Sequence, residues 1–321
     1  MTPILIDCDP GIDDAVAILF ALASGKMDVR AITTVSGNLP ADHCSSNARK
    51  LLDLAQAGSI PVARGPLKPL VRPFPRDPFS HGDDGLGELT LPASLRLEDA
   101  RFAPDLILDA ASEAEGALTI LALGPLTNLA LAVIKDPTLP QRVRRVVCIA
   151  GAFGFHSTGS TRATGDNPAS EWNVYVDPEA ARIVFEAGFE LTAIGLDVAT
   201  HPSIELTDVH RARIRASGTA AAQFLLGVVD FVERRGFKSY CGLIDALAVA
   251  AVLDPSLFEV EKVRVAIETS SALTLGQTVV DRREHFRWDH LPQIAAACNV
   301  NAPGFLDLLV DSLCSTRPDS L

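Results

Sequence analysis

The chain has 321 residues, enough to bury a large core in one α/β domain or in two smaller ones. Acidic residues outnumber basic ones by 40 to 28, which gives a formal net charge of −12, and no long stretch concentrates lysine and arginine. This balance disfavours nucleic acid as a partner, and many small aliphatic residues with few aromatic ones are typical of a soluble enzyme built on a parallel sheet.

Short apolar segments alternate along the chain with segments of helical periodicity. The predicted buried strands are 4–8, 29–35, 118–123, 143–150 and 191–196. The predicted helices are 12–23, 41–57, 104–114, 126–134, 178–187, 220–234 and 244–253. This alternation predicts an α/β fold in which a mostly parallel sheet is flanked by helices. We expect a single domain over residues 1–321. Ligands bind such sheets beyond the carboxyl ends of the strands.

Four aspartates, Asp7, Asp9, Asp13 and Asp14, fall within eight residues directly after the start of the first predicted strand. A Pro-Gly turn separates the first pair from the second pair, which falls in the first turn of the next predicted helix. Carboxylates this close repel one another, so a folded protein needs a hard cation to hold them together in its interior. The cluster therefore predicts a metal site with oxygen ligands.

Two other interpretations of the cluster stay open from the residues alone. In the first, Asp13 and Asp14 only complement the helix dipole, while Asp7 and Asp9 lie in a solvated loop. In the second, the cluster resembles the aspartate-rich strand end of haloacid-dehalogenase-type phosphotransferases, with Asp7 as the nucleophile of a metal-dependent phosphohydrolase. The Pro-Gly pair after Asp9 departs from that pattern.

The sequence also indicates a cytoplasmic protein that does not contact a membrane. No signal peptide is expected, because the acidic cluster begins at Asp7 and removal of a leader would remove it. The longest apolar segment, 117–134, is interrupted by glycine, proline and polar residues, which excludes a membrane span. The six cysteines lack Cys-x-x-Cys spacing, so neither a zinc site nor a disulfide framework is expected.

Polar residues follow several of the predicted strands. Residues 36–38 follow the second strand, 124–128 follow the third, and Gly151 follows the fourth. Each alone is ordinary turn chemistry. Their common position at strand ends favours one cleft shared with the aspartates.

Six segments together resemble the inosine-uridine-preferring nucleoside hydrolase family and occur in that family's order. They are DCDPGIDDA at 7–15, TTVSGN at 33–38, HGDDGLG at 81–87, ALGPLTN at 122–128, EWN at 171–173 with VDPEAA at 176–181, and DALAVA at 245–250. Each segment alone is a weak signal. The six in this order span nearly the whole chain and are highly specific.

The resemblance implies an open α/β fold with a single Ca²⁺ at the floor of the pocket. The implied ligands are the carboxylates of Asp9, Asp14 and Asp245 and the backbone carbonyl of Thr127. This donor set agrees with the acidic cluster, because calcium takes oxygen ligands. Taken alone, Asp245 is equally an ordinary helix N-cap.

The implied reaction is hydrolysis of the N-glycosidic bond of a ribonucleoside, which releases ribose and a free base. Asp9 is the implied general base, taking a proton from a water that calcium acidifies. The implied substrate-binding residues are Asp13, Asn38, His81, Asn167, Glu171 and Asn173. The expected partner is a small-molecule ribonucleoside, and the expected assembly is a homodimer or homotetramer. A nucleoside-binding or regulatory protein with negligible turnover is the alternative.

One departure from the family pattern affects the leaving base. Many members carry a histidine directly before the last calcium-ligating aspartate, and this chain carries Ile244. An isoleucine cannot protonate a leaving group, so another residue has that role or the base leaves with little help. The candidates that the sequence offers are Tyr240, Cys241, His81 and His156.

Two further departures concern the pocket wall. Residues 149–151 read Ile-Ala-Gly where members commonly show Met-Gly-Gly. The segment between Asn167 and Glu171 is shorter than in the family, which leaves the register of Asn167 toward the 5′-hydroxyl open. The loops 72–87 and 153–167 are expected to close over the base.

The position of Trp172 follows from its neighbours. In a strand or extended loop its side chain points away from those of Glu171 and Asn173. We therefore expect Trp172 to pack into the core.

Overall fold

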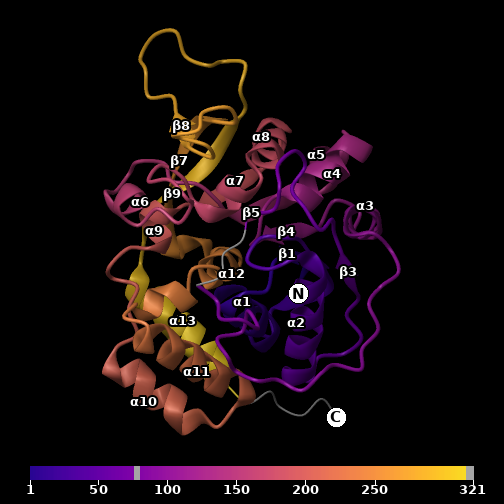
Figure 1. Cartoon of the computed structure of the whole chain (residues 1–321), viewed down its shortest axis with the longest axis vertical. Helices are drawn as coiled ribbons and strands as arrows, with labels where there is room; N and C mark the ends of the chain where they lie inside the picture. Colours follow the sequence, from indigo (N-terminus) through magenta and orange to yellow (C-terminus); the bar gives the residue numbers. More distant parts are fainter. Residues whose placement is uncertain (76–79, 316–321) are drawn as a thin grey trace.

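In the computed structural model, residues 1–75 and 80–315 are described. Nine strands within these residues form one sheet in the order β3-β2-β1-β4-β5-β6-β9-β7-β8 (Figure 1). The strands are β1 (Thr2–Cys8), β2 (Met27–Thr34), β3 (Val62–Arg64), β4 (Thr119–Ala122), β5 (Arg145–Ile149), β6 (Leu191–Ile194), β7 (Phe258–Ile267), β8 (Thr278–Val280) and β9 (Gln293–Val300).

The helices connect the strands and cover both faces of the sheet. They are α1 (Ile12–Ala23), α2 (Ala41–Leu54), α3 (Ala103–Glu113), α4 (Thr127–Lys135), α5 (Leu139–Arg142), α6 (Thr158–Thr161), α7 (Trp172–Val176), α8 (Pro178–Glu186), α9 (Leu196–Ala199), α10 (Asp208–Ser217), α11 (Ala220–Arg234), α12 (Ala246–Leu253) and α13 (Ala302–Cys314), with the 3₁₀ helices η1 (Ser239–Gly242) and η2 (Pro255–Leu257).

In the order of the sheet, the first seven strands, from β3 to β9, run parallel to one another. The last two differ, because β7 pairs antiparallel with both β9 and β8. The predicted fold class, an open and mostly parallel sheet flanked by helices, is confirmed. Each of the five predicted strands is present with ends shifted by at most two residues, and the predicted helices are present with similar shifts.

The side chains of β1 point alternately to the two faces of the sheet, and both faces are covered by helices. Ile4 and Ile6 pack into a core formed with α1, α11, α12 and α13, whereas Leu5 packs into a second core with α3, α4 and α8. Figure 1 shows these two groups of helices on opposite sides of the molecule. A strand buried on both faces has no polar alternation, which is why it reads as a continuous apolar run.

The site is positioned by the strand order around β1. β2 and β3 lie on one side of β1, while β4, β5 and β6 lie on the other, so the connections after β1 and β4 diverge. Such a reversal of strand order opens a crevice at the carboxyl ends of the strands. Asp9 follows β1 and Thr127 follows β4, and both therefore lie at this crevice.

Two further observations concern membrane-spanning helices and cysteines. Within the described residues, no helix has both the length and the apolar character that crossing a bilayer requires. The six cysteines are free thiols.

The helix that carries Asp13 and Asp14 depends on its apolar packing. α1 is buried almost throughout, and Phe20 is completely buried near its end. We expect Phe20→Ala to lower the free energy of unfolding by about 3–5 kcal/mol, because it removes a large buried ring and leaves a cavity. Chemical denaturation measures this loss. Phe286→Ala is the control, since Phe286 is 93% exposed and its truncation is expected to change stability by about 0.5 kcal/mol or less. Equal losses in both variants would contradict the assignment of α1 to the core.

Candidate functional site

The loop after β1 is folded around the carboxylate of Asp14. Its Oδ1 accepts a hydrogen bond from the backbone N–H of Asp9 at 3.0 Å, and its Oδ2 accepts one from Gly11 N–H at 3.0 Å. The side-chain amide of Asn38 donates to the same Oδ2 at 3.1 Å. Asp14 therefore holds the start of α1 against the end of β1 and ties both to the loop after β2.

Asp9 lies in a space bounded by two glycine turns. Asn38 N–H donates to Asp9 Oδ2 at 2.6 Å, while Oδ1 is buried and has no hydrogen-bond partner in the described part of the chain. A Cβ atom on Gly37 would lie 2.0 Å from Oδ2, and one on Gly124 would lie 2.4 Å from Oδ1. The turns after β2 and β4 thus close on Asp9, and one of its oxygens is left to accept a proton or bind a cation.

Three carboxylates meet at the floor of the site. Oxygens of Asp13, Asp14 and Asp245 lie within 4.8 Å of one another, and all three residues are buried. Asp13 and Asp14 come from the first turn of α1, and Asp245 caps α12, more than 200 residues later. Tertiary structure therefore brings Asp245 into the acidic cluster that the sequence shows at residues 7–14.

The electrostatics of the cluster oppose full ionisation of its members. Burial raises the pKa of Asp14 to about 6, and the charge of Asp13 adds to the shift. Burial together with neighbouring carboxylates raises the pKa of Asp9 and of Asp245 well above the usual range. A bound cation would remove this repulsion, and carboxylate oxygens are the donors that hard cations such as Ca²⁺ take. The residues present therefore fit a divalent cation.

The start of α4, where Thr127 lies, is held by buried hydrogen bonds. The Thr127 hydroxyl donates to Asp177 Oδ2 at 2.7 Å. The amide of the next residue, Asn128, donates to Asp7 Oδ1 at 2.8 Å. Because the side chains of Thr127 and Asn128 are both fixed, the backbone has little freedom at Thr127, whose carbonyl is the predicted ligand.

Glu171 caps the short helix α7 from inside the protein. Its Oε1 accepts from Asn173 N–H at 2.8 Å, and its Oε2 accepts from Val174 and Gly151 N–H, each at 3.1 Å. Burial raises the pKa of Glu171 to about 7. The side-chain amide of Asn173 donates to two carbonyls at the ends of β4 and β5, at 2.7 and 3.0 Å. These contacts fix both side chains at the sheet edge.

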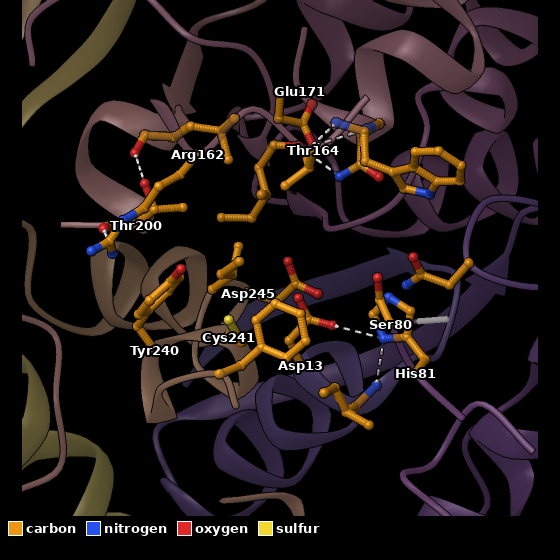
Figure 2. A pocket seen from close by; sticks show the side chains of 18 of the residues that line it. Asp13, Ser80, His81, Arg162, Thr164, Glu171, Thr200, Tyr240, Cys241 and Asp245 are labelled. Atoms are coloured by element: carbon orange, nitrogen blue, oxygen red, sulfur yellow. Dashed lines mark hydrogen bonds and ion pairs between the residues drawn. The ribbon is translucent and has the colours of Figure 1, made fainter. Parts of the chain in front are cut away.

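A cavity of about 380 Å³, the size of a small-molecule site, opens onto this edge (Figure 2). The predicted site residues that line it are Asp13, Asn38, His81, Glu171, Asn173 and Asp245. Figure 2 shows Asp13 and Asp245 together on one wall and Glu171 across the cavity from them. His81 Nδ1 accepts a hydrogen bond from Ile12 N–H at 3.2 Å and lies 3.7 Å from Asp13 Oδ1.

The other predicted site residues are not part of the lining. Asp9, Asp14 and Thr127 are buried next to the cavity. The side-chain amide of Asn167 makes two hydrogen bonds to nearby backbone groups. It donates to Leu275 O at 2.9 Å and accepts from Ala169 N–H at 2.9 Å. The structure therefore brings Asn167 into a loop contact and not to the cavity, and its role toward substrate stays a prediction.

The expectation that Trp172 packs into the core is wrong. Glu171 is a helix cap and Trp172 begins α7, so the strand alternation on which the expectation rested does not apply. Trp172 lines the cavity and its ring stacks on that of Tyr175 at 5.9 Å.

The cavity lining also includes residues that sequence analysis did not single out. They include Arg162, Thr164, Thr200, Val232 and Phe237, together with Tyr240, Cys241 and Ile244, which the sequence did flag. Residues 80–87 and 153–167 contribute Ser80, His81 and Arg162 to the lining, while residues 76–79 of the first predicted loop lie outside the described part. No motif marks Arg162, because only the folded loop brings it to the cavity.

Comparisons with known proteins agree along nearly the whole chain. The family model described as inosine-uridine preferring nucleoside hydrolase matches residues 4–307. An inosine-uridine preferring nucleoside hydrolase of Leishmania major is 41% identical, over 87% of this chain and 88% of the relative. The pyrimidine-specific ribonucleoside hydrolase RihA of Shewanella sp. (strain ANA-3) is 38% identical, over 99% and 98%. The solved structure of the plant nucleoside hydrolase PpNRh1 is 31% identical, covers 98% of this chain and 99% of its own, and superposes with a TM-score of 0.86.

The buried cap Asp177 is expected to matter more for stability than an exposed cap of the same kind. Asp177 accepts hydrogen bonds from Thr127, from Leu70 N–H and from Ala180 N–H. We expect Asp177→Ala to lower the free energy of unfolding by about 2–4 kcal/mol, because it removes a cap and leaves buried donors without acceptors.

Asp254→Ala is the matched control for this prediction. Asp254 also precedes a proline and caps a helix, but its bonds to Ser256 lie at the surface. We expect it to cost about 1 kcal/mol. Chemical denaturation measures both variants, and an Asp177→Ala loss no larger than that of the control would contradict the anchoring role.

Proposed function

Because the chain belongs to the inosine-uridine preferring nucleoside hydrolase family, we propose that it hydrolyses ribonucleosides with the help of one bound Ca²⁺. The enzyme class follows from the family: the chain is an N-glycosidase that acts on ribonucleosides. The observation that carries the metal proposal is the convergence of Asp13, Asp14 and Asp245 at the floor of a cavity of nucleoside size.

We propose that the cation is held by Asp9, Asp14, Asp245 and the backbone carbonyl of Thr127. The buried, unpartnered Oδ1 of Asp9 supports its place in this set, since a buried acceptor without a partner is costly. When bound, calcium would supply electrostatic stabilisation, orient ribose hydroxyls and acidify a water. Asp13 lies beside Asp14 and Asp245 and lines the cavity, which suits it to grip a ribose hydroxyl.

Asp9 is proposed as the general base. Its Oδ2 is fixed by Asn38 N–H, and its Oδ1 has no hydrogen-bond partner among the described residues, so Oδ1 is the oxygen that would meet the cation and its bound water. Burial and the charge of Asp14 raise the pKa of the Asp9 carboxyl in the metal-free chain. The bound cation would lower this pKa again, so that Asp9 is ionised and can accept the proton. The surrounding carboxylates also favour the positive charge that develops on the ribose as the glycosidic bond breaks.

The other predicted site residues that line the cavity are proposed to bind the sugar. Asn38, Glu171 and Asn173 present fixed polar side chains at the sheet edge, and His81 lies beside Asp13. A site that hydrogen-bonds each hydroxyl discriminates against a substrate that lacks one, because its buried groups are then left unpaired.

The phosphohydrolase alternative with Asp7 as nucleophile is wrong. The family match excludes it, and Asp7 is completely buried, with Oδ1 accepting from Thr33 and Asn128. A nucleoside-binding protein with negligible turnover is the second candidate function, because Ile244 takes the place of a histidine that the family pattern carries near the leaving base.

We further propose that residues 1–321 act as one catalytic domain in the cytoplasm and assemble as a homodimer or homotetramer. The assembly part of this proposal rests on the family resemblance alone. Light scattering of the purified protein measures its mass in solution.

Ribose release is expected from at least some ribonucleosides and not from their 2′-deoxy counterparts. A reducing-sugar assay on purine, pyrimidine and modified ribonucleosides tests this, before and after removal of calcium by chelation. We expect chelation to abolish turnover and added Ca²⁺ to restore it. Binding of ribonucleosides without any ribose release would favour the binding-protein alternative, and turnover that survives chelation would contradict the metal proposal.

Asp9→Asn is expected to lower kcat by about 10²–10⁴-fold, because it removes the proton acceptor and keeps the side-chain volume. Initial rates of ribose release measure the effect, and thermal unfolding checks that the fold is kept. Asp83→Asn is the control, since Asp83 is an exposed aspartate in the loop beside His81 and is not part of the lining. Wild-type activity in Asp9→Asn would remove Asp9 from the role of base.

A further inference from the structure

Part of the cavity lining is apolar, and we call this part the apolar wall. Leu196, Val232, Phe237 and Ile244 form it. The polar side chains that would hold a ribose lie at the sheet edge, so the apolar part is where a flat base fits. In Figure 2, Cys241 and Tyr240 lie on the side of Asp245 away from His81.

Tyr240 also lines the cavity and contributes a phenol to it. The ring is half-buried, and burial raises its pKa to about 12 even though Arg162 acts in the opposite direction. The phenol therefore keeps its proton at neutral pH and is a hydrogen-bond donor. The groups that act on its pKa are the Cys241 thiol, which is a weak acceptor, the Arg162 guanidinium, which accepts no hydrogen bond, and the carboxylate of Glu205. Glu205 already accepts from the Ser239 hydroxyl and pairs with Lys238.

Arg162 lies against the ring of Tyr240. The guanidinium carbon is 4.5 Å from the ring centroid, and Nη1 donates to the carbonyl oxygen of Thr200 (Figure 2). A ring face and a carbonyl oxygen orient the guanidinium without neutralising its charge. The pair therefore adds positive potential to a site whose other charged groups are carboxylates.

The loop that carries Arg162 is anchored by one buried carboxylate. Asp197 accepts hydrogen bonds from the backbone N–H groups of Phe153, Phe155 and His156, at 2.5, 2.8 and 3.1 Å. The Thr158 hydroxyl donates to the carbonyl of Asp197 at 3.2 Å. Arg162 is thus the end of a fixed loop, so its position on Tyr240 is built into the fold.

We propose that Tyr240 donates a hydrogen bond to the departing base and that Arg162 positions the phenol and strengthens it as a donor. This inference rests on the proposed hydrolysis. As the bond between C1′ and the base nitrogen breaks, its electron pair moves onto the base, while the water oxygen bonds to C1′ and its proton goes to Asp9. Tyr240 stabilises the negative charge without losing its proton, and the base nitrogen then takes a proton from solvent.

The other polar residues around the base region are weaker candidates. His81 is held by Ile12 N–H and lies beside Asp13, on the ribose side. Cys241 is a thiol with its pKa raised by burial, and a thiol is a weak donor. Ile244 offers no polar group.

The test compares a ribonucleoside that the wild type hydrolyses with p-nitrophenyl β-D-riboside, whose leaving group is a stable anion that needs little assistance. We expect Tyr240→Phe to lower kcat on the ribonucleoside by about 10²-fold and on the p-nitrophenyl riboside by less than about threefold. We expect Arg162→Met to give about a 10-fold loss with the same selectivity, and Arg162→Lys to recover part of it, because a cation on the ring is restored.

Matched controls come from the same chain. Tyr175→Phe changes the other tyrosine, whose hydroxyl donates to Asp166 outside the cavity. Arg282→Met changes an arginine with the same two kinds of contact, over the ring of Phe155 and to the carbonyl of Phe153. Both are expected to leave the ratio of the two activities at the wild-type value.

The outcomes separate this inference from the proposed function. A wild type that releases ribose from no ribonucleoside contradicts the proposed function. An active wild type with an unchanged Tyr240→Phe variant overturns only the role of Tyr240. Equal losses on both substrates in Tyr240→Phe or Arg162→Met also overturn it, because a purely structural defect does not depend on the leaving group.

Discussion

Repulsion among buried carboxylates is the constraint on which the site depends. Asp9, Asp13, Asp14 and Asp245 share a region from which most water is excluded, and burial together with the neighbouring charges raises the pKa values of Asp9, Asp14 and Asp245. Such a cluster is stable only if backbone donors, protons or a cation offset the charge. Backbone N–H groups do so for Asp14 and for one oxygen of Asp9, while Oδ1 of Asp9 has no hydrogen-bond partner within residues 1–75 and 80–315.

The parallel sheet makes this concentration of charge possible. Its buried strands deliver chain segments from distant parts of the sequence to one edge, and the reversal of strand order beside β1 opens the crevice there. Glycines then let the backbone approach closely: any side chain at Gly37 or Gly124 would overlap Asp9. The cap residues Glu171 and Asp177 fix the flanking helices from inside, so the polar groups of the site are preorganised before substrate binds.

Much of the fold was predictable from sequence because strands buried on both faces are apolar runs. The later strands were missed for the opposite reason: β7 carries exposed charged residues such as Glu259 and Glu261, and it pairs antiparallel, so its pattern is that of a surface segment. The polar helix α10 gave no apolar stripe that would mark it.

The acidic part of the site was predictable because Asp9, Asp13 and Asp14 are adjacent in sequence, and the resemblance supplied Asp245. The base end was not predictable in the same way. Arg162 reaches Tyr240 only through a loop held by Asp197. Asp197 contacts Phe155 and His156, which lie 42 and 41 positions earlier, and no local pattern encodes such contacts. Trp172 was misplaced because a one-turn helix was taken for an extended segment.

Calorimetric titration of the metal-free protein with Ca²⁺ tests the central claim most directly, with the amount of bound metal determined on the same sample. The account predicts one calcium bound per chain, with binding abolished or strongly weakened in Asp245→Asn and unchanged in Asp83→Asn. Absence of any bound calcium in a folded, active wild type would contradict it, as would equally tight binding in Asp245→Asn.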